Sequence, residues 1–355
     1  MERQLLMLPG PMQVPESVAR AGSRPLFFHR SPRFIEFQDR LRRRIQPLFG
    51  TSSARVVFLS ACGTGAMESA LVNVTSPGEE VIVMVGGAFA GRWVEIGRAF
   101  GLAVHPVEVD WPTGATGQDV AAAMDRFPAA RVVCVTWSES STGVLIDLES
   151  IGTAVRERGG LLLADAVSGL AVSPLDIDRW HADVVVSGSQ KGLMMPPGLG
   201  VVALSDRAFE WSSSAASPRF TWDWRPYFES VPVTPPLSLM HQLDAALDII
   251  EGMGLPAFYA RRHEVAETIR RLVTGAGLEL YARRPGDGIT AVVAPGTMDI
   301  ARFRKRLEDD YGIVIGGGQG RTAGEVFRIG HVGAVDDDEL AYFSRSFIEA
   351  VGPEL

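Results

Sequence analysis

The chain has 355 residues, 46% of them apolar, and a formal net charge of −8. This length and apolar content predict a globular enzyme of two domains, and the negative charge argues against nucleic acid or an anionic membrane as the main partner. Pro9 and Gly10 interrupt the apolar N-terminus, and no later apolar run approaches membrane-spanning length, so we expect a cytoplasmic protein. The two cysteines fit a reducing compartment, and no cluster of Cys and His has the spacing of a metal site.

Strand-like and helical patterns alternate through the first two thirds of the chain. Phe34, Phe37 and Leu41 stand at helical spacing beside a basic run that is expected to be the solvated face of an amphipathic helix. The continuous apolar runs that follow are residues 56–59, 81–85, 131–135, 161–163, 184–186 and 199–204. Because helical patterns separate several of these runs, they predict an α/β fold with a mostly parallel sheet covered on both faces. Ligands of such sheets bind beyond the carboxyl ends of the strands.

The pattern changes after residue 211. Residues 212–236 are rich in Ser, Pro and aromatic residues and indicate a connection or the rim of a site. Helical segments between residues 238 and 272, strands at 288–293 and 326–329, and helices from Asp299 and Asp337 then predict a smaller C-terminal α+β domain. We therefore divide the chain into an N-terminal arm (1–20), a large domain (21–237) and a small domain (238–355).

Lys191 is one of two lysines among 34 basic residues. It follows the apolar run 184–186 and a small polar turn, so its amine is expected in a cleft at a strand end. An arginine could supply the charge there, but a guanidinium does not deprotonate and cannot form a Schiff base with an aldehyde. The alternative is that an arginine-rich composition spared one lysine by chance. The other lysine, Lys305, lies in a charged helical run typical of a solvated face.

Four further features stand at or near strand ends, and each has a structural alternative. The glycine turn at residues 62–68 offers free N–H groups and a helix dipole to a phosphate, but it lacks the spacing of NAD and ATP motifs and could be a simple turn. Asp165 ends a buried strand and needs a cation such as a protonated pyridine, or else it caps a helix or pairs with an arginine. Phe89 is set among small residues where a flat ligand could approach, although an isolated aromatic is usually core. Arg328 lies between apolar strand residues and suits a carboxylate or a structural ion pair.

Several segments together resemble those of one enzyme family, in the same order along the chain. They are residues 8–11, 29–32, 62–68, 138–143, 165–168, 187–191, 196–198 and 327–331. Over nearly its whole length the chain resembles the class V, fold-type I pyridoxal-phosphate aminotransferases, in the alanine–glyoxylate/serine–pyruvate branch. The Ser-Gly-Ser-Gln-Lys segment with its Pro-Pro-Gly sequel is highly specific, whereas Gly-Thr-Gly alone is not.

The resemblance implies pyridoxal 5'-phosphate as the cofactor and roles for individual residues. Lys191 is similar to the Schiff-base lysine and Asp165 to the partner of the pyridinium nitrogen. The other residues implied to contact the cofactor are Cys62, Gly63, Thr64, Phe89, Ser140, Val167, Gln190 and, from the neighbouring subunit of a homodimer, Thr234. Arg328 and His29 are implied to contact the substrate. Val231 stands where other members have a tyrosine, and Cys62 where a serine is common, which leaves substrate and cofactor affinity open.

The implied reaction is a ping-pong transfer of an amino group from an amino acid to a small oxo acid such as glyoxylate or pyruvate. The same fold also supports β-elimination, decarboxylation and oxidative deamination, and Trp137 with the segment 221–225 could shape a larger substrate of secondary metabolism. A desulfurase is disfavoured because neither cysteine stands on an obvious mobile loop in the second half of the chain. A non-catalytic module that binds a phosphorylated metabolite is the alternative from another class.

Overall fold

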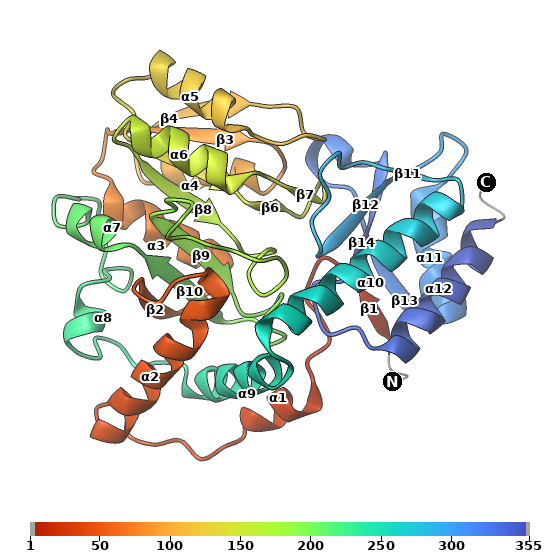
Figure 1. The fold of residues 1–355 in the computed structure, drawn as a ribbon, viewed down its shortest axis with the longest axis horizontal. Coiled ribbons are helices and arrows are strands. Elements are labelled where there is room, and N and C mark those ends of the chain that lie inside the picture. The colour runs from red at the N-terminus through yellow and green to blue at the C-terminus, as the bar shows by residue number, and fades with distance from the viewer. Residues whose placement is uncertain (1–3, 353–355) are drawn as a thin grey trace.

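The computed structural model describes residues 4–352, which form two large β-sheets with their helices (Figure 1). The larger sheet has seven strands in the order β2-β10-β9-β8-β5-β3-β4. Its strands are β2 (Arg55–Ser60), β3 (Glu80–Val85), β4 (Ala103–Glu108), β5 (Val132–Thr136), β8 (Leu161–Asp165), β9 (Val184–Gly188) and β10 (Leu199–Leu204). β10 runs antiparallel to both of its neighbours, and the other neighbouring pairs are parallel. The carboxyl ends of β2, β3, β5, β8 and β9 therefore meet at one edge, and the predicted mostly parallel sheet is confirmed.

Both faces of this sheet are covered, because alternate residues of each strand enter different hydrophobic clusters. Val56 and Phe58 belong to one cluster, and Val57 and Leu59 belong to the other. The helices of the first cluster are α1 (Glu16–Ala21), α2 (Pro32–Ile45), α5 (Gly117–Arg126), α6 (Leu148–Glu157) and α9 (Leu237–Met253). Those of the second are α3 (Gly63–Val74), α4 (Ala90–Ala99), α7 (Asp206–Trp211) and α8 (Pro226–Glu229).

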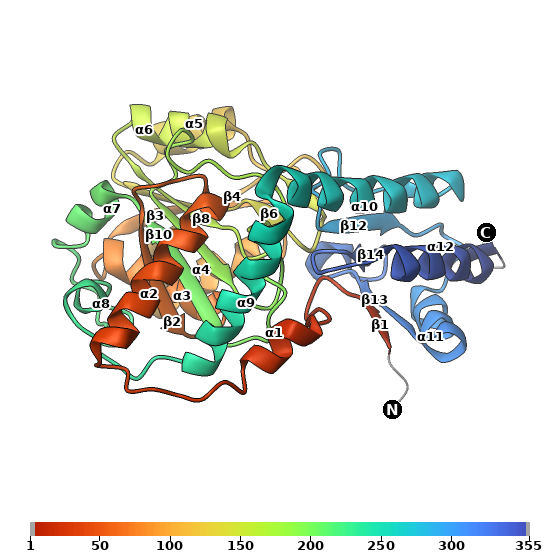
Figure 2. The ribbon, with the colours of Figure 1, turned by 60° about the horizontal axis from the view of Figure 1, so that its bottom comes forward.

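The second sheet has five strands in the order β1-β13-β14-β12-β11. Its strands are β1 (Leu5–Met7), β11 (Glu279–Leu280), β12 (Ile289–Val293), β13 (Ile313–Gly317) and β14 (Val326–Gly330). Three helices pack into its core, namely α10 (Leu255–Gly275), α11 (Ile300–Tyr311) and α12 (Asp337–Val351) (Figure 2). The remaining short elements are η1 (Gln46–Phe49), β6 (Ser138–Glu139), β7 (Val144–Leu145) and η2 (Gly320–Thr322).

The N-terminal arm connects the two parts of the molecule. β1 pairs in parallel with β13 as an edge strand of the small sheet, and α1 packs on the large core (Figure 1). The arm is closely packed, since a Cβ on Gly330 of β14 would lie 1.9 Å from the Leu8 carbonyl oxygen. The proposed domain boundary at residue 237 stays a prediction, and helix α9, which begins there, packs with the core of the large sheet. Residues 1–3 and 353–355 of the expected outer domains lie outside the described residues.

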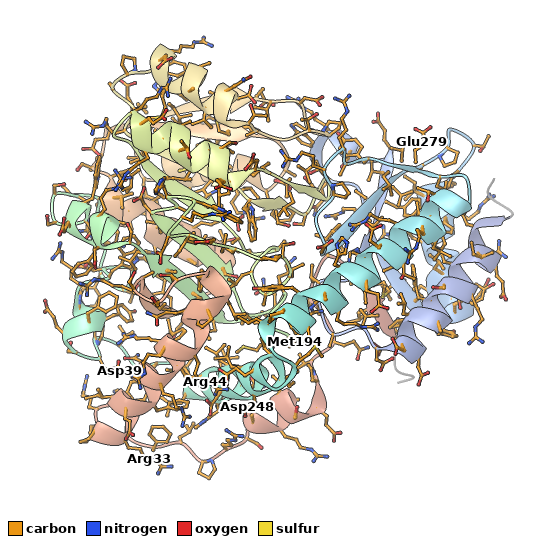
Figure 3. All side chains as sticks on the ribbon, in the orientation of Figure 1. Arg33, Asp39, Arg44, Met194, Asp248 and Glu279 are labelled. Carbon is orange, nitrogen blue, oxygen red and sulfur yellow. The ribbon has the colours of Figure 1, made fainter. Side chains whose placement is uncertain are left out.

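The amphipathic helix predicted around Phe34 is α2, but its basic run is not simply a solvated face. The Arg44 side chain is 16% exposed and donates at 2.7 Å to both Asp248 and Glu251 of α9. Figure 3 shows Arg44 and Asp248 close together where α2 meets α9. Arg44 is therefore an ion-pair connection between two helices, which the charge pattern of α2 alone does not reveal. Within residues 4–352, no helix combines the length and the apolar character needed to span a bilayer.

Candidate active site

Loops after β2, β3, β5, β8 and β9 form a cavity of about 360 Å³ at the carboxyl edge of the large sheet. The cavity brings together predicted residues from all five loops. They are Cys62, Gly63, Thr64, Phe89, Ser140, Asp165, Val167, Gln190 and Lys191. This volume lies within the usual range of small-molecule sites, about 300–1,000 Å³. The parallel strand order thus positions side chains that are far apart in the sequence.

Lys191 lies three residues after β9, under the N-terminal arm. Its Nζ donates a hydrogen bond to the Pro9 carbonyl oxygen. Burial lowers the pKa of Lys191 to about 8, the charge of Asp165 opposes this shift, and Arg328 lowers the pKa further. Gly10 has φ +131°, and a Cβ there would lie 2.8 Å from Nζ, so the arm passes directly over the amine. A buried amine with a lowered pKa is partly neutral near pH 8 and can act as a nucleophile or base.

Asp165 ends β8 and is 5% exposed. Its Oδ1 accepts a hydrogen bond from the Val167 backbone N–H at 2.8 Å. Burial raises the pKa of Asp165 to about 7, and the nearby charge of Glu139 raises it further. Among residues 4–352, no cationic side chain forms an ion pair with this carboxylate. Asp165 is therefore a buried acid whose ionised form needs a cation inside the cavity.

The start of α3 forms the anion-binding end of the cavity. Cys62 is the N-cap, but its side chain makes no capping hydrogen bond, which leaves N–H groups of the first turn free of side-chain acceptors. A Cβ at position 63 would lie 2.5 Å from Val167 Cγ2, so only glycine allows the helix start to approach the loop after β8. The buried Oε1 of Gln190 has no hydrogen-bond partner in the described part of the chain. Free N–H groups at a helix start suit a phosphate group, and Gln190 could donate to it only through its side-chain NH2.

Arg92 and Glu139 are two charged residues of this site to which the sequence analysis assigned no role. Arg92 lines the cavity, donates to Thr64 Oγ1 at 3.0 Å and stacks 5.0 Å above the centre of the Phe89 ring. Glu139 is buried and accepts hydrogen bonds from the backbone N–H groups of Phe89 and Ala90, at 3.1 and 2.9 Å. Its other oxygen accepts from the Ser141 N–H and hydroxyl. Glu139 therefore holds the loop that carries Phe89 next to the loop that carries Ser140.

Arg328 of β14 reaches the site from the small domain. Nε donates to the Gly317 carbonyl at 2.7 Å, and Nη1 donates to the Ser140 carbonyl at 2.8 Å. Both acceptors are neutral, and no carboxylate among residues 4–352 forms an ion pair with Arg328. Burial lowers the pKa of Arg328 to about 10. The charge of Glu139 partly opposes this pKa shift. A guanidinium held by carbonyls, with no carboxylate in direct contact, is suited to bind a carboxylate.

Three predicted residues do not line this cavity in the single chain. Arg328 meets its wall through the Ser140 carbonyl, and the other two are His29 and Thr234. His29 is half-buried with its ring 5.4 Å from that of Phe28, and Thr234 is exposed. Of the tryptophans considered for a larger substrate, Trp137 and Trp224 are 2% and 0% exposed and belong to the cores of the large domain. Trp222 is partly buried beside Gly65 of α3 and does not line the cavity.

A sheet edge with a buried lysine and carboxylate, an anion-binding helix start and an arginine from a second domain defines the fold-type I class of α/β enzymes. The chain belongs to the class V aminotransferase family, whose model matches residues 18–328. The chain is 34% identical to the L-aspartate–glyoxylate aminotransferase of Paracoccus denitrificans, over 94% of this chain and 87% of that one. It is 36% identical to a protein named soluble hydrogenase, small subunit, of Synechococcus sp., over 100% and 94% of the two chains.

The same family appears among solved structures. The crystal structure of an alanine–glyoxylate aminotransferase from Nostoc sp. superimposes with a TM-score of 0.93 at 27% identity, covering 99% of this chain and 96% of that one. This chain is therefore an enzyme of the class V aminotransferase family, with the two-domain fold predicted from its sequence.

Proposed function

We propose that this aminotransferase uses pyridoxal 5'-phosphate to move an amino group between an amino acid and glyoxylate or a similar small oxo acid. The observation that carries the proposal is the juxtaposition of Lys191, with its lowered pKa, and Asp165, a buried acid without a cationic partner. An aldehyde that reacts with a lysine and a ring nitrogen that carries a proton meet both needs at once.

The other residues of the cavity fit the same cofactor. The start of α3, Thr64 and Gln190 would hold its phosphate, with Arg92 supplying positive charge nearby. Phe89 and Val167 would pack on the ring. Cys62 and Ser140 line the same cavity and would contact the cofactor edge.

The chain's own residues divide the chemical work. Arg328 binds the substrate carboxylate, because within residues 4–352 its guanidinium donates only to two neutral carbonyls. Lys191 Nζ takes the proton from the substrate Cα, since a neutral amine near pH 8 is a competent base. Asp165 stays ionised to pair with a protonated ring nitrogen, and Gly10 with Pro9 covers Lys191. The bound cofactor supplies the ring that accepts the electrons released from Cα.

Glyoxylate is proposed as the acceptor because it recurs in the names of the relatives. These include aspartate–, serine– and alanine–glyoxylate aminotransferases at 34%, 33% and 30% identity. The cavity of about 360 Å³ suits small donors of this kind. The names of these relatives share glyoxylate as the acceptor and differ in the amino acid that donates the amino group. The half-reaction below therefore compares amino donors.

A single half-reaction tests this proposal. The cofactor-loaded enzyme is mixed with aspartate, serine or alanine and no oxo acid, and the cofactor absorbance and the organic products are followed. We expect one equivalent of oxo acid, with the aminated cofactor remaining until glyoxylate restores the starting spectrum. Catalytic release of ammonia or carbon dioxide without aminated cofactor would instead support elimination or decarboxylation.

We also propose a homodimer in which Thr234 of each subunit contacts the phosphate site of the other. Thr234 is exposed and lies outside the cavity of its own chain, as a residue serving a partner would. A cytoplasmic location is proposed from the two free cysteines, one exposed and one buried.

A further inference from the structure

A second cavity, of about 410 Å³, lies between the two domains and shares no lining residue with the active-site cavity. Its walls come from the end of α9, the first half of α10, the loop at residues 331–337 and Met194. Figure 3 labels Met194 beside the junction of α9 and α10, where the two domains meet. The cavity is separate from the site described above.

Most of its wall is apolar. The side chains of Met194, Ile249, Phe258, Val265 and Val335 line the cavity. Met253 also lines it and is 48% exposed, so it stands where the cavity opens to solvent. A cavity of this size and lining suits an apolar group rather than a cluster of water molecules.

One side chain on this wall is a buried cation. Arg262 of α10 is 5% exposed, and its Nε and Nη2 have no hydrogen-bond partner in the described part of the chain. Its guanidinium carbon lies 4.7 Å above the centre of the Phe258 ring, which covers one face of the group. Burial lowers the pKa of Arg262 to about 10, and the charge of Arg261 lowers it further. Arg262 therefore remains charged at neutral pH without a counter-ion, an arrangement that is unfavourable in the free protein.

Two carboxylates that line this cavity, Asp336 and Asp337, form their hydrogen bonds and ion pairs with groups other than Arg262. Asp337 pairs with Arg261, and Asp336 caps α12 by accepting from the Glu339 backbone N–H at 2.8 Å. His331, on the inner wall, is bonded through Nε2 to Thr290 and through Nδ1 to the Asp287 carbonyl, and its pKa is lowered to about 3 by burial. His331 is thus neutral and does not supply the missing negative charge.

The uncompensated charge of Arg262 defines the missing partner. Nε and Nη2 are covered by protein atoms, so a carboxylate in the cavity acts on the guanidinium through its charge. We propose that this cavity binds a small carboxylate with an apolar body, which balances the charge of Arg262 at the cavity wall while its chain packs against Ile249, Val265 and Val335. Arg262 is then a ligand-binding residue that the apoprotein retains at the expense of stability.

The test uses octanoate as the probe, with octanamide as its neutral analogue, titrated calorimetrically into the cofactor-loaded enzyme. Octanoate should bind at one site per chain. Octanamide should bind at least about tenfold more weakly, since the attraction between a carboxylate and an uncompensated guanidinium contributes more than the about 1.4 kcal/mol that corresponds to tenfold. Failure of octanoate to bind below ~5 mM, or equal binding of the two probes, would overturn the proposal.

Variants locate the bound probe. Arg262→Leu and Arg262→Gln should each weaken octanoate at least about tenfold, whereas Arg271→Leu, an exposed position on the same helix, should not. Arg328→Leu should leave octanoate binding unchanged; its loss in that variant would place the probe in the active site and refute the inference. Because it removes an unpaired buried charge, Arg262→Leu should also melt no lower than the native enzyme. A lower melting temperature would show that Arg262 has a structural role instead.

Discussion

At the scale of single residues, burial decides the chemistry of Lys191, Asp165 and Arg328. Burial lowers the pKa of the lysine and of the arginine and raises that of the aspartate, and each of these groups lacks a side-chain partner of opposite charge in direct contact. In the proposed function, a bound cofactor and substrate complete the charge balance of these three groups. Their separate contributions can be tested one side chain at a time.

Asp165→Asn should slow proton abstraction at least about a hundredfold, because a neutral amide cannot keep a pyridinium charged. The apoprotein offers a second measurement. The folded-state pKa of Asp165 is about 7 and its ordinary value 3.8, so the stability associated with this group is fully present below pH 3.8 and is lost as pH rises to 7.

The melting temperature of the Asp165→Asn apoprotein should therefore exceed that of the native apoprotein by a margin that grows between these pH values and is constant above pH 7. Asp178→Asn, at an exposed carboxylate that forms no ion pair within residues 4–352, should stay within about 1 °C of the native protein. A margin independent of pH would show that Asp165 is already ionised and paired in the apoprotein.

Arg328→Leu should lower kcat/KM for amino acids by an amount that corresponds to roughly 2–5 kcal/mol, and Arg328→Lys should recover only part of the loss. Lysine keeps the charge but not the planar fork that binds a carboxylate through two hydrogen bonds. Cofactor absorbance in the absence of substrate should stay unchanged in both variants. Equal reactivity of the native enzyme with amines that lack a carboxylate would contradict this role.

At the scale of elements, the close approach of α3 to the loop after β8 determines where a phosphate can sit. Gly63→Ala should weaken cofactor binding at least about fivefold, because the new Cβ would lie 2.5 Å from Val167 Cγ2 and must displace the helix start or the valine. Val167→Ala in the same chain should restore most of the loss. Gly91→Ala in α4, where nothing lies within 4 Å of the added Cβ, is the matched control. Equal dissociation constants for Gly63→Ala and native enzyme would exclude a tight helix start.

The elements also show what the sequence could predict. The buried strands β2, β3, β5, β8 and β9 have continuous apolar runs, so the sheet and the site loops after them followed from local pattern. β4 was missed because it is an edge strand whose apolar pattern His105 and Pro106 interrupt. β1 has three residues and is defined by pairing with β13, which lies more than 300 residues later.

Glu139 and Arg92 could not be predicted as site residues, because their contacts, like the pairing of β1, are made with residues distant in the sequence. Glu139 acts through the N–H groups of Phe89 and Ala90, which are 50 and 49 residues away, and Arg92 acts through Thr64, 28 residues away. Both stand in segments that already attracted attention, but a charged residue in a loop has no local periodicity that indicates its partner. Such contacts are visible only after folding brings the loops together.

At the scale of the whole molecule, the N-terminal arm and Arg328 make the active site a product of both domains. The arm adds an edge strand to the small sheet, covers Lys191 with Gly10 and then packs α1 on the large core. Arg328 extends from the small sheet and donates a hydrogen bond to the Ser140 carbonyl of the large domain. Relative movement of the domains would therefore change the surroundings of Lys191, its cover by Gly10 and the position of Arg328 together.

A shared-site homodimer predicts that dilution releases cofactor as the subunits separate. Thr234→Ala should weaken cofactor binding, because it removes a phosphate contact in the partner's site. In mixed dimers of Lys191→Ala with Thr234→Ala chains, one site should carry both lesions and the other neither, so half of the native sites should remain. Sedimentation of a monomer that keeps full cofactor occupancy would refute the shared-site arrangement.

The central claim is that Lys191 holds pyridoxal 5'-phosphate covalently, and borohydride reduction followed by peptide mass spectrometry tests it most directly. Reduction makes the link to the amine permanent, and Lys305 provides an internal control because it is exposed and paired with Asp309 at 2.7 Å. We predict that the pyridoxyl mass maps to the peptide that contains Lys191 and is absent from the Lys191→Ala chain. A pyridoxyl mass on Lys305, or on no lysine, would contradict the account.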